Sequence, residues 1–386
     1  MADTRTITSL AFPEGSLPLG LDPEPMAVRM GDLVFTNGIP GIDLTTGALP
    51  PTPEAQFAQA YQNLERLLDT AGVGMDGVGL VTVFIPEPDY RQHINPGWFD
   101  LFPDEADRPA RKTNHVNLPE GVYVQLQATA VAGARRRLVG IPGLSHRDPL
   151  PMGCRVGDLF FTSVMTPQDP ADGKNAAGPV PQIERCFENI AQIMQQAGGS
   201  LDDALHLWVF MSDFTYQPEM VTEWVRRWPK DGDRPARKTL RYALGGDSLL
   251  QAQVTAVLGG TRTNYELPHG GHHDPIPLAS RAGPLLMSSG ISGTGPNQGG
   301  REVPGLAPQI ELCQRDIAAL MQTAGGSLDN VALVTVLVQD WASVPVMLQH
   351  WDQLYPDRDN RPALKFIDWR MPQGMSVVQY HLTAVM

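Results

Sequence analysis

The chain has 386 residues, of which 42% are hydrophobic and 18% charged, so it is long enough for several domains with cores of their own. Its formal net charge of −13 argues against a partner bound through neutralised phosphates, and we expect no nucleic-acid partner. The first residues hold no apolar run of signal-peptide length, and nowhere do about 18 apolar residues follow one another. These features predict a cytoplasmic protein with no membrane partner.

The clearest pattern in the chain is a threefold repeat. An Asp-Pro-x-Pro motif begins at Asp22, Asp148 and Asp274, and the interval, 148 − 22 or 274 − 148, is 126 residues both times. An Arg-Pro-Ala motif recurs downstream, at Arg108, Arg234 and Arg361. A period of this length is that of a whole domain rather than of a solenoid unit. We therefore predict three similar domains, at residues 1–133, 134–259 and 260–386.

The first half of each copy is predicted to hold a hairpin and a helix. In the first copy, residues 27–29 and 33–37 are short apolar runs on either side of a Gly-containing turn, which predicts two strands. Apolar residues at helical spacing predict a helix over residues 54–71, and Gly72 ends it.

The second half adds strands and a shorter helix. The β-branched run 79–85 predicts a buried strand, and Trp98 lies in the apolar stripe of a short helix. Residues 112–116 and 122–131 supply the last two strands. Along the final strand polar and apolar residues alternate, which indicates one packed face and one polar face. Each copy is therefore predicted to be an α+β layer.

The segments between copies contain several histidines. They are His146, His269, His272 and His273, and their spacing matches no standard metal-ligand set. We interpret these segments as flexible linkers and expect no metal and no other cofactor.

Five sequence segments together resemble the RidA/YjgF family of imine and enamine deaminases. They are residues 31–38, the helix end at 71–72, residues 81–84, residues 108–111, and Leu118-Pro119 before the last strand. The second and third copies repeat most of them. Family members are usually single domains that form homotrimers, with ligand sites between subunits. The resemblance implies three tandem RidA-like (chorismate-mutase-like) domains that form a monomeric intrachain pseudo-trimer, with a β-barrel core and the helices outside.

The resemblance also implies an arginine that grips a substrate carboxylate. By alignment this arginine is Arg111 in the first copy and Arg237 in the second, whereas the third copy has Leu364. A guanidinium suits this role because its planar fork makes two parallel charge-assisted hydrogen bonds. The alternative is an ordinary ion pair, with Asp104 or Asp231 as the candidate partners.

A second element implied by the resemblance is a glutamate on the last strand that places or activates the attacking water. The aligned residues are Gln125, Gln251 and Gln379, and an amide orients water but cannot accept a proton. Either the hydrolysis needs no strong base, because a protonated imine is already electrophilic, or the chemistry differs. Glu24 aligns near a family tyrosine and is a candidate substitute base, the alternative being a solvated loop carboxylate.

Further substrate-binding candidates come from the same alignment. They are Asn37, Gly38, Ser163, Ser289 and Gly290 in a loop whose backbone amides suit a carboxylate, Asn95 on the second helix, and Gln379. Lys112, Lys238 and Lys365 follow the arginine position and so point to the opposite face of the strand. We interpret the lysines mainly as solvent or inter-domain charges, and keep Lys112 and Lys238 as candidates for substrate binding.

The resemblance implies a hydrolytic deaminase of a small carboxylate-bearing enamine or imine, such as a 2-imino acid or a 2-aminomuconate-type ring-cleavage product. Arg111 or Arg237 would hold the carboxylate, and water on Gln125 or Gln251 would attack the C=N carbon and release ammonia. Two alternatives stay open. One is a ring-opening amidohydrolase of the cyanuric acid hydrolase or barbiturase type, although no serine recurs at one place in all three copies. The other is a pseudo-trimer that binds ligands without catalysis.

Overall fold

The computed structural model describes residues 5–13, 23–268, 272–293, 303–369 and 376–386. These residues form an α+β fold, and the three predicted copies share one order of strands and helices, except that the second copy has no strand matching β4 (Ile39–Pro40) and β17 (Ile291–Ser292). They group into two compact units. Unit 1 is Met1–Asp104, Lys112–Arg135 and Ile291–Met386, and unit 2 is Glu105–Arg111 and Arg136–Gly290. The division into domains 1–133, 134–259 and 260–386 stays a prediction.

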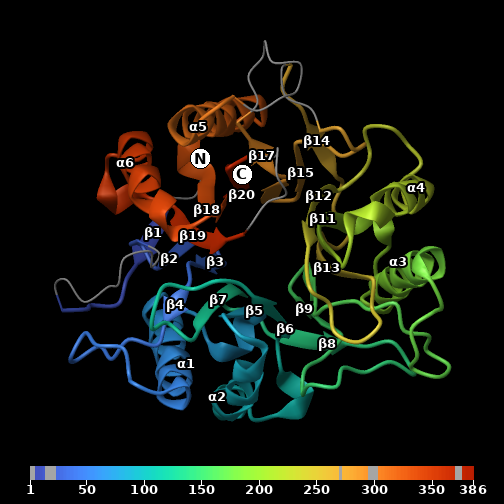
Figure 1. The fold of residues 1–386 in the computed structure, drawn as a ribbon, viewed down its shortest axis with the longest axis horizontal. Coiled ribbons are helices and arrows are strands. Elements are labelled where there is room, and N and C mark those ends of the chain that lie inside the picture. The colour runs from blue at the N-terminus through green and yellow to red at the C-terminus, as the bar shows by residue number, and fades with distance from the viewer. Residues whose placement is uncertain (1–4, 14–22, 269–271, 294–302, 370–375) are drawn as a thin grey trace. The chain divides into compact units, whose positions relative to one another are not determined.

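The first copy contributes one sheet and two helices to unit 1. The strand order is β1-β2-β3-β7-β5-β6, and β4 also pairs with β7. The elements are β1 (Thr6–Thr8), β2 (Ala27–Met30), β3 (Leu33–Thr36), β4 (Ile39–Pro40), α1 (Pro53–Thr70), β5 (Val78–Ile85), α2 (Ile94–Leu101), β6 (Ala110–His115) and β7 (Gln125–Val131). Helices α1 and α2 lie side by side along the sheet (Figure 1).

Unit 1 also holds most of the third copy. Its elements are β17 (Ile291–Ser292), α5 (Leu306–Thr323), β18 (Val331–Val338), α6 (Val344–Leu354), β19 (Ala363–Asp368) and β20 (Val378–Val385). Strand β18 pairs in parallel with β19 and antiparallel with β20, as β5 does with β7 in the first copy.

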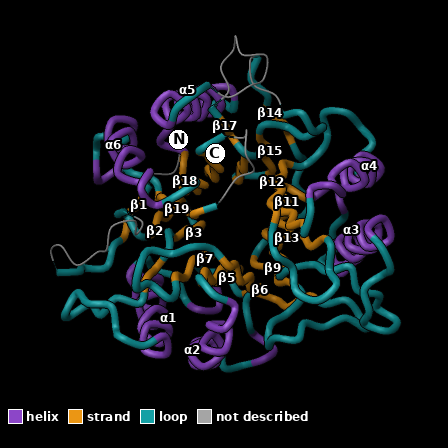
Figure 2. The backbone as a smooth tube through the Cα atoms, viewed as in Figure 1, coloured by secondary structure: helices purple, strands orange, loops and turns teal. Residues whose placement is uncertain are grey.

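Unit 2 contains the second copy and the first hairpin of the third. Its sheet has the order β12-β11-β13-β10-β9-β8, and β15 pairs with both β14 and β16. The elements are β8 (Arg136–Val139), β9 (Gly153–Val156), β10 (Leu159–Thr162), α3 (Pro179–Gln196), β11 (Ala204–Met211), α4 (Gln217–Arg227), β12 (Ala236–Arg241), β13 (Leu250–Val257), β14 (Thr263–Tyr265), β15 (Ala279–Ala282) and β16 (Leu285–Ser288). Figure 2 shows α3 and α4 together on one side of the strands of this unit.

Local sequence explains where helix α1 begins and ends. Helix α1 starts after Thr52, whose Oγ1 accepts a hydrogen bond from the backbone N of Ala55 at 3.3 Å, and Pro53 occupies the first turn. It ends at Thr70, and Gly72, two residues beyond, has a φ of 73°, a backbone conformation that favours glycine. The predicted helix over residues 54–71 is therefore confirmed to within one residue.

The core of unit 2 lies between its helices and one face of its sheet. Phe187 and Ile190 of α3 are fully buried, as are Leu207 of β11 and Val254 of β13. Trp224 of α4 belongs to the same cluster and is also fully buried. Helix packing therefore covers the sheet face to which Leu207 and Val254 point, and this face carries the functional candidate described below.

The predicted β-barrel core is wrong for this sheet. Among the described residues, β12 pairs only with β11 and β8 only with β9, so the sheet has two open edges. A hydrogen-bonded barrel requires every strand to pair on both sides. The open edge at β12 is where the arginine strand lies.

No helix in the described part of the chain combines the length and the apolar character needed to cross a bilayer.

Candidate functional site: two buried arginines beside carboxylates

Arg237 is buried at the open edge of the sheet in unit 2. It is the second residue of β12, and its register partner Leu207 pairs in turn with Val254. Laterally paired residues share a face, so Arg237 points to the helix-covered side. Its guanidinium lies 4.7 Å from the ring centroid of Trp224, and only 1% of the residue is exposed. The cation is thereby fixed between a strand edge and an aromatic ring.

Residues on either side of the β15–β16 hairpin of the third copy hold this arginine in place. Ser289 Oγ accepts a hydrogen bond from the backbone N of Arg237 at 3.0 Å and donates one to the carbonyl of Pro277 at 2.7 Å. Asp274 Oδ2 accepts from Arg237 Nη2 and also from Gln217 Nε2, the latter at 2.9 Å. We call Arg237, Thr239, His272, Asp274 and Ser289 the Arg237 cluster. It joins residues of the second and third copies within one compact unit.

Several polar atoms of this cluster are buried without a hydrogen-bond partner among the described residues. They are Nε and Nη1 of Arg237, Oγ1 of Thr239 and Nε2 of His272. Thr239 lies two positions after Arg237 on β12, so both side chains point to the same face. A buried polar group left without a partner costs about 1–3 kcal/mol, so these atoms call for a partner such as a ligand or an ordered water. This set of atoms suits a small polar ligand.

Burial sets the charges of the cluster. It lowers the pKa of Arg237 to about 10, against the opposing effect of Asp274, so the guanidinium stays protonated at neutral pH. Burial, together with the positive charges of Lys238 and Arg237, lowers the pKa of His272 to about 4. Burial also lowers the pKa of Lys238 to about 8. At pH 7 the cluster therefore holds one cation, Arg237, one carboxylate, Asp274, and a neutral imidazole, while Lys238 points to the opposite face of β12.

The same arrangement occurs one copy earlier. Arg111 is 3% exposed, and its backbone N donates to Ser163 Oγ at 3.0 Å. Its Nη2 lies 3.6 Å from Oδ2 of Asp148, the residue that matches Asp274. We call Arg111, Asp148 and Ser163 the Arg111 cluster. Both arginines therefore form ion pairs, but with the Asp of the repeat motif and not with the two candidates that the sequence suggested. Of these, Asp231 pairs with Arg234.

The third copy has buried apolar side chains at the position of the arginine. Leu364 and Phe366 of β19 stand where Arg237 and Thr239 stand in β12, and they are 2% and 0% exposed. Asn37, which matches Ser163 and Ser289, donates from Nδ2 to the carbonyl of Pro23 at 2.9 Å. Neither Leu364 nor Phe366 can bind a carboxylate through its side chain.

Of the interpretation as solvent or inter-domain charges, the solvent part is wrong for the buried Lys365 and Lys112, whereas Lys365 does join the third copy to the first. Lys365 is fully buried, donates from Nζ to Gln125 Oε1 at 2.8 Å, and lies 4.8 Å from the ring centroid of Phe84. Lys112 is 6% exposed, and burial with the nearby Arg91 charge lowers its pKa to about 7. Lys238 is half-buried.

In the second copy the arginine and the glutamine point to opposite faces of the sheet. Gln251 pairs with Phe210 of β11, three residues beyond Leu207, so it points to the sheet face opposite Arg237. Water held by Gln251 would therefore lie on the wrong side of β12. Gln125 instead contacts the third copy through Lys365.

The remaining predicted residues lie in loops or at element ends. Glu24 is exposed, Gly38 is buried, Asn95 is half-buried on α2, Gly290 is half-buried directly after Ser289, and Gln379 is half-buried near the start of β20. Glu24, Gly38, Asn95 and Gln379 belong to unit 1 and Gly290 to unit 2.

Sequence analysis missed part of the Arg237 cluster. Asp274 served only as a repeat marker, and His272 was assigned to a flexible linker although its Nε2 is buried. The sequence did contain a signal for this pair of residues, because the two-residue spacing of His272 and Asp274 recurs at His146 and Asp148. His269 lies outside the described residues.

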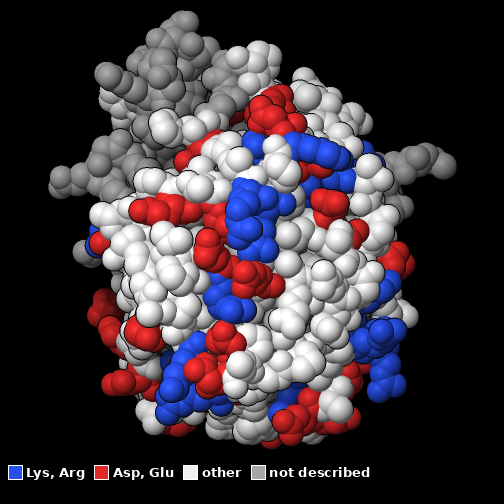
Figure 3. Space-filling model, turned by 90° about the vertical axis from the view of Figure 1, so that its right-hand side faces the viewer, with Lys and Arg blue, Asp and Glu red and all other residues white. Residues whose placement is uncertain are grey.

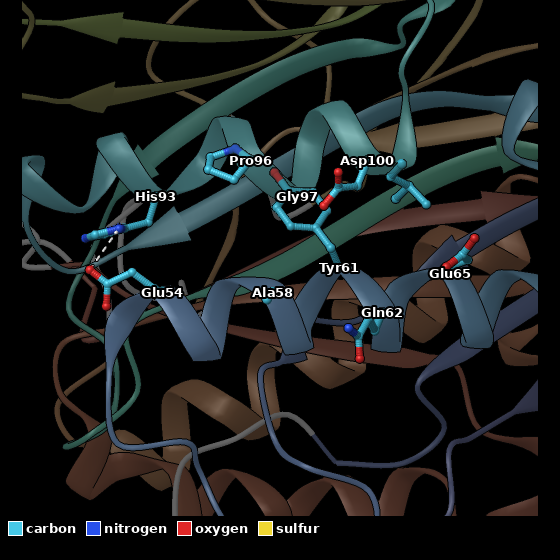
Figure 4. A pocket seen from close by; sticks show the side chains of 10 residues that line it. Glu54, Ala58, Tyr61, Gln62, Glu65, His93, Pro96, Gly97 and Asp100 are labelled. Carbon is cyan, nitrogen blue, oxygen red and sulfur yellow. Dashed lines mark ion pairs between the residues drawn. The ribbon is translucent and has the colours of Figure 1, made fainter.

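A pocket of about 240 Å³ lies between α1 and α2 of unit 1 (Figure 4). Glu54 and His93 form an ion pair at one end, with 3.4 Å between His93 Nδ1 and Glu54 Oε1, and Asp100 and Glu65 also line it. Its ten lining residues include no arginine or lysine. It therefore offers a carboxylate neither arginine nor lysine, and its His93 already faces Glu54.

Charges of both signs alternate on the face drawn in Figure 3. In unit 2, Arg185 pairs with Asp169 at 2.9 Å and with Glu188 at 3.0 Å, and Arg227 pairs with Glu223. The described residues on this face form no uniformly basic surface of the kind that holds a phosphate backbone.

The open α+β sheet with a buried arginine on its parallel edge strand defines a RidA-like domain. The family model described as Endoribonuclease L-PSP matches residues 24–132 and 147–245, more than half of the chain, and the chain belongs to this family. The two matches fall in the first and second copies.

Individual relatives each match about one copy. A RutC family protein of Aquifex aeolicus is 30% identical over 120 residues, which is 31% of this chain and 94% of that protein. The 2-iminobutanoate/2-iminopropanoate deaminase of Salmonella typhimurium is 28% identical over 116 residues, or 30% of this chain and 91% of that protein. Among solved structures, RidA from the Antarctic bacterium Psychrobacter sp. PAMC 21119 is 22% identical, and the match covers 32% of this chain and 99% of that protein, with a TM-score of 0.30.

Proposed function

We propose that this chain is a hydrolytic deaminase of small carboxylate-bearing imines or enamines, with working sites at the Arg237 and Arg111 clusters. The products would be a keto acid and ammonia. Relatives in the same family carry the name 2-iminobutanoate/2-iminopropanoate deaminase, which supports a 2-imino acid as the substrate class. A 2-aminomuconate-type ring-cleavage product, a carboxylate-bearing enamine, is the second candidate substrate.

The observation that carries this proposal is the pair of unpartnered donors on a buried cation. Arg237 uses Nη2 for Asp274, and Nε and Nη1 have no partner among the described residues. A ligand carboxylate would satisfy them with charge-assisted hydrogen bonds, which contribute about 1.5–3 kcal/mol each. The Thr239 hydroxyl, on the same face, is available to the imine end of such a ligand.

The chemistry needs little beyond orientation and one proton acceptor. Water attacks the C=N carbon of the protonated imine, a carbinolamine forms, and the C–N bond breaks to release ammonia. Arg237 would fix the carboxylate, and the Trp224 ring would exclude bulk water from one side of the guanidinium. The apolar third copy has no such cation, so we assign no site to Leu364.

Ammonia release from 2-iminopropanoate and 2-iminobutanoate, generated in situ by an amino-acid oxidase, tests the proposal. We expect turnover by the wild type, partial activity in Arg111→Ala and in Arg237→Ala, and a loss of about 100-fold in kcat/KM in the double variant, equivalent to roughly 2.7 kcal/mol. Leu364→Ala is the matched control at the equivalent strand position and should keep wild-type kcat/KM.

Two results would count against a deaminase. Wild-type protein that releases no ammonia above the spontaneous rate from either imine or from a 2-aminomuconate removes the assignment. If that protein still binds pyruvate through Arg111 and Arg237, the chain is a ligand-binding protein without catalysis.

A further inference from the structure

The proposed reaction needs a proton acceptor near Arg237, and the last strand does not supply one. Gln251 has an amide in place of a carboxylate, and it points to the opposite face of the sheet from Arg237. Another acceptor is therefore required on the helix-covered face.

Asp274 is a carboxylate in the required place. It contacts Arg237 through Oδ2, and the same oxygen accepts the hydrogen bond from Gln217 Nε2. Oδ1 accepts no hydrogen bond from any described residue, and the side chain is 17% exposed. One oxygen is thus anchored by two donors while the other keeps its lone pairs for water.

The first arginine has the same neighbour. Asp148 Oδ2 lies 3.6 Å from Arg111 Nη2, and its side chain is 33% exposed. Asp148 and Asp274 begin the same motif in successive copies, and each follows a histidine by two residues. The corresponding Asp22 lies outside the described residues, and the third copy lacks the arginine. Where the arginine is present in the described structure, the aspartate accompanies it.

We propose that Asp274 at the Arg237 cluster, and Asp148 at the Arg111 cluster, are the bases that activate the attacking water. This inference rests on the proposed deaminase function. In the first step a water oxygen bonds to the C2 carbon of the iminium ion, the C=N π electrons move to nitrogen, and the aspartate takes the water proton. In the second step the aspartic acid returns that proton to the amine nitrogen. The C–N bond then breaks with its electron pair going to nitrogen, the hydroxyl oxygen forms the carbonyl, and the hydroxyl proton passes to the departing ammonia, which leaves as ammonium.

A purely structural aspartate would behave differently. If Asp274 only oriented Arg237, its removal would weaken carboxylate binding and raise KM, with little change in kcat. If it is the base, its removal lowers kcat, while binding stays or tightens because a competing carboxylate has left the guanidinium.

The test compares the wild type with Asp148→Asn, Asp274→Asn and the double variant, each shown to be folded by thermal denaturation. We expect the double variant to lose at least about 100-fold in kcat for 2-iminopropanoate, in line with general base catalysis, while the Kd of pyruvate stays within threefold or falls. Added formate should restore part of the activity of the Asp148→Ala/Asp274→Ala variant, since the small carboxylate can occupy the vacated place.

Active wild-type enzyme with an unchanged kcat in the double Asn variant would overturn the base assignment and leave the deaminase function intact. A loss of kcat that is matched by a loss of pyruvate binding would also overturn it, because a positioning role would then explain the result. An inactive wild type would instead reject the deaminase function itself.

Discussion

Lys365 donates a hydrogen bond from Nζ to Oε1 of Gln125 at 2.8 Å, although the two residues stand 240 positions apart in the chain. Both side chains are fully buried, and the Phe84 ring lies 4.8 Å from the ammonium group. The same Nζ also donates to the carbonyl of Phe366 at 2.5 Å, so the buried ammonium group depends on these two neutral acceptors. The glutamine that aligns with a catalytic glutamate is therefore a structural partner of a lysine.

This contact predicts that Gln125→Leu destabilises the fold by about 2–4 kcal/mol, because it removes a hydrogen-bond acceptor from a buried ammonium group. Gln251→Leu is the matched control at the half-buried equivalent position and should cost under about 1 kcal/mol. The double variant Gln125→Leu/Lys365→Met should recover most of the lost stability. Urea denaturation measures all three, and equal effects of the two glutamine variants would contradict the assignment.

The Thr239 hydroxyl predicts a separation of stability from activity. Its Oγ1 is buried with no partner among the described residues, so Thr239→Val should leave the free energy of unfolding unchanged or raise it by up to about 1 kcal/mol. If the hydroxyl contacts substrate, kcat/KM should fall by about tenfold. Thermal melts and ammonia release give the two values, and a variant that is destabilised yet fully active would contradict the prediction.

The lowered pKa of Lys238 predicts how the KM of the substrate changes at alkaline pH. The pKa of this lysine is lowered to about 8, and its charge acts on His272 of the Arg237 cluster, so the positive charge near the cluster declines as pH rises through 8. The KM for an anionic substrate should rise over that range. In Lys238→Arg the charge persists, because arginine stays protonated, and the rise in KM should move to higher pH. Identical profiles for the two proteins would show that this charge has no part in binding.

Lys112 predicts a pH dependence of stability. Its pKa is about 7 in the folded chain and about 10.5 when unfolded, so between these values the unfolded chain binds the extra proton and stability rises with pH. Below pH 7 both states are charged and the full burial penalty is present. Each pKa unit corresponds to about 1.4 kcal/mol, so Lys112→Met should be clearly more stable than wild type at pH 6.

The difference between Lys112→Met and wild type should shrink as the pH approaches 10. Guanidinium denaturation at pH 6, 8 and 10 measures it. A variant that is less stable than wild type at pH 6, or a difference independent of pH, would contradict the buried-lysine account.

The fold follows largely from local sequence patterns. The stripe that buries Phe57 and Leu64, the Gly72 helix end and the β-branched run of β5 are local signals, and each predicted element appears where expected. Family membership of the chain is confirmed as well. The intrachain pseudo-trimer and the cytoplasmic location stay predictions.

The site was predictable only in part, because its residues meet through pairings that the sequence does not state. Arg111 and Arg237 were found through the family resemblance. The contact of Arg237 with Asp274 depends on how the β15–β16 hairpin of the third copy packs against β12. That packing also brings Ser289 to the backbone N of Arg237. The separation of Gln251 from Arg237 follows from strand register, which assigns Gln251 to the opposite face. Single-copy alignment cannot show either relationship.

A crystal structure of the wild-type chain with pyruvate, the keto acid that the proposed reaction forms from 2-iminopropanoate, tests the central claim most directly. We predict its carboxylate on Nε and Nη1 of Arg237 and on the guanidinium of Arg111, its carbonyl carbon on the side of the free oxygen of Asp274, and no pyruvate at Leu364. Pyruvate bound away from both arginines, or Arg237 still without a ligand at saturating pyruvate, would contradict the account.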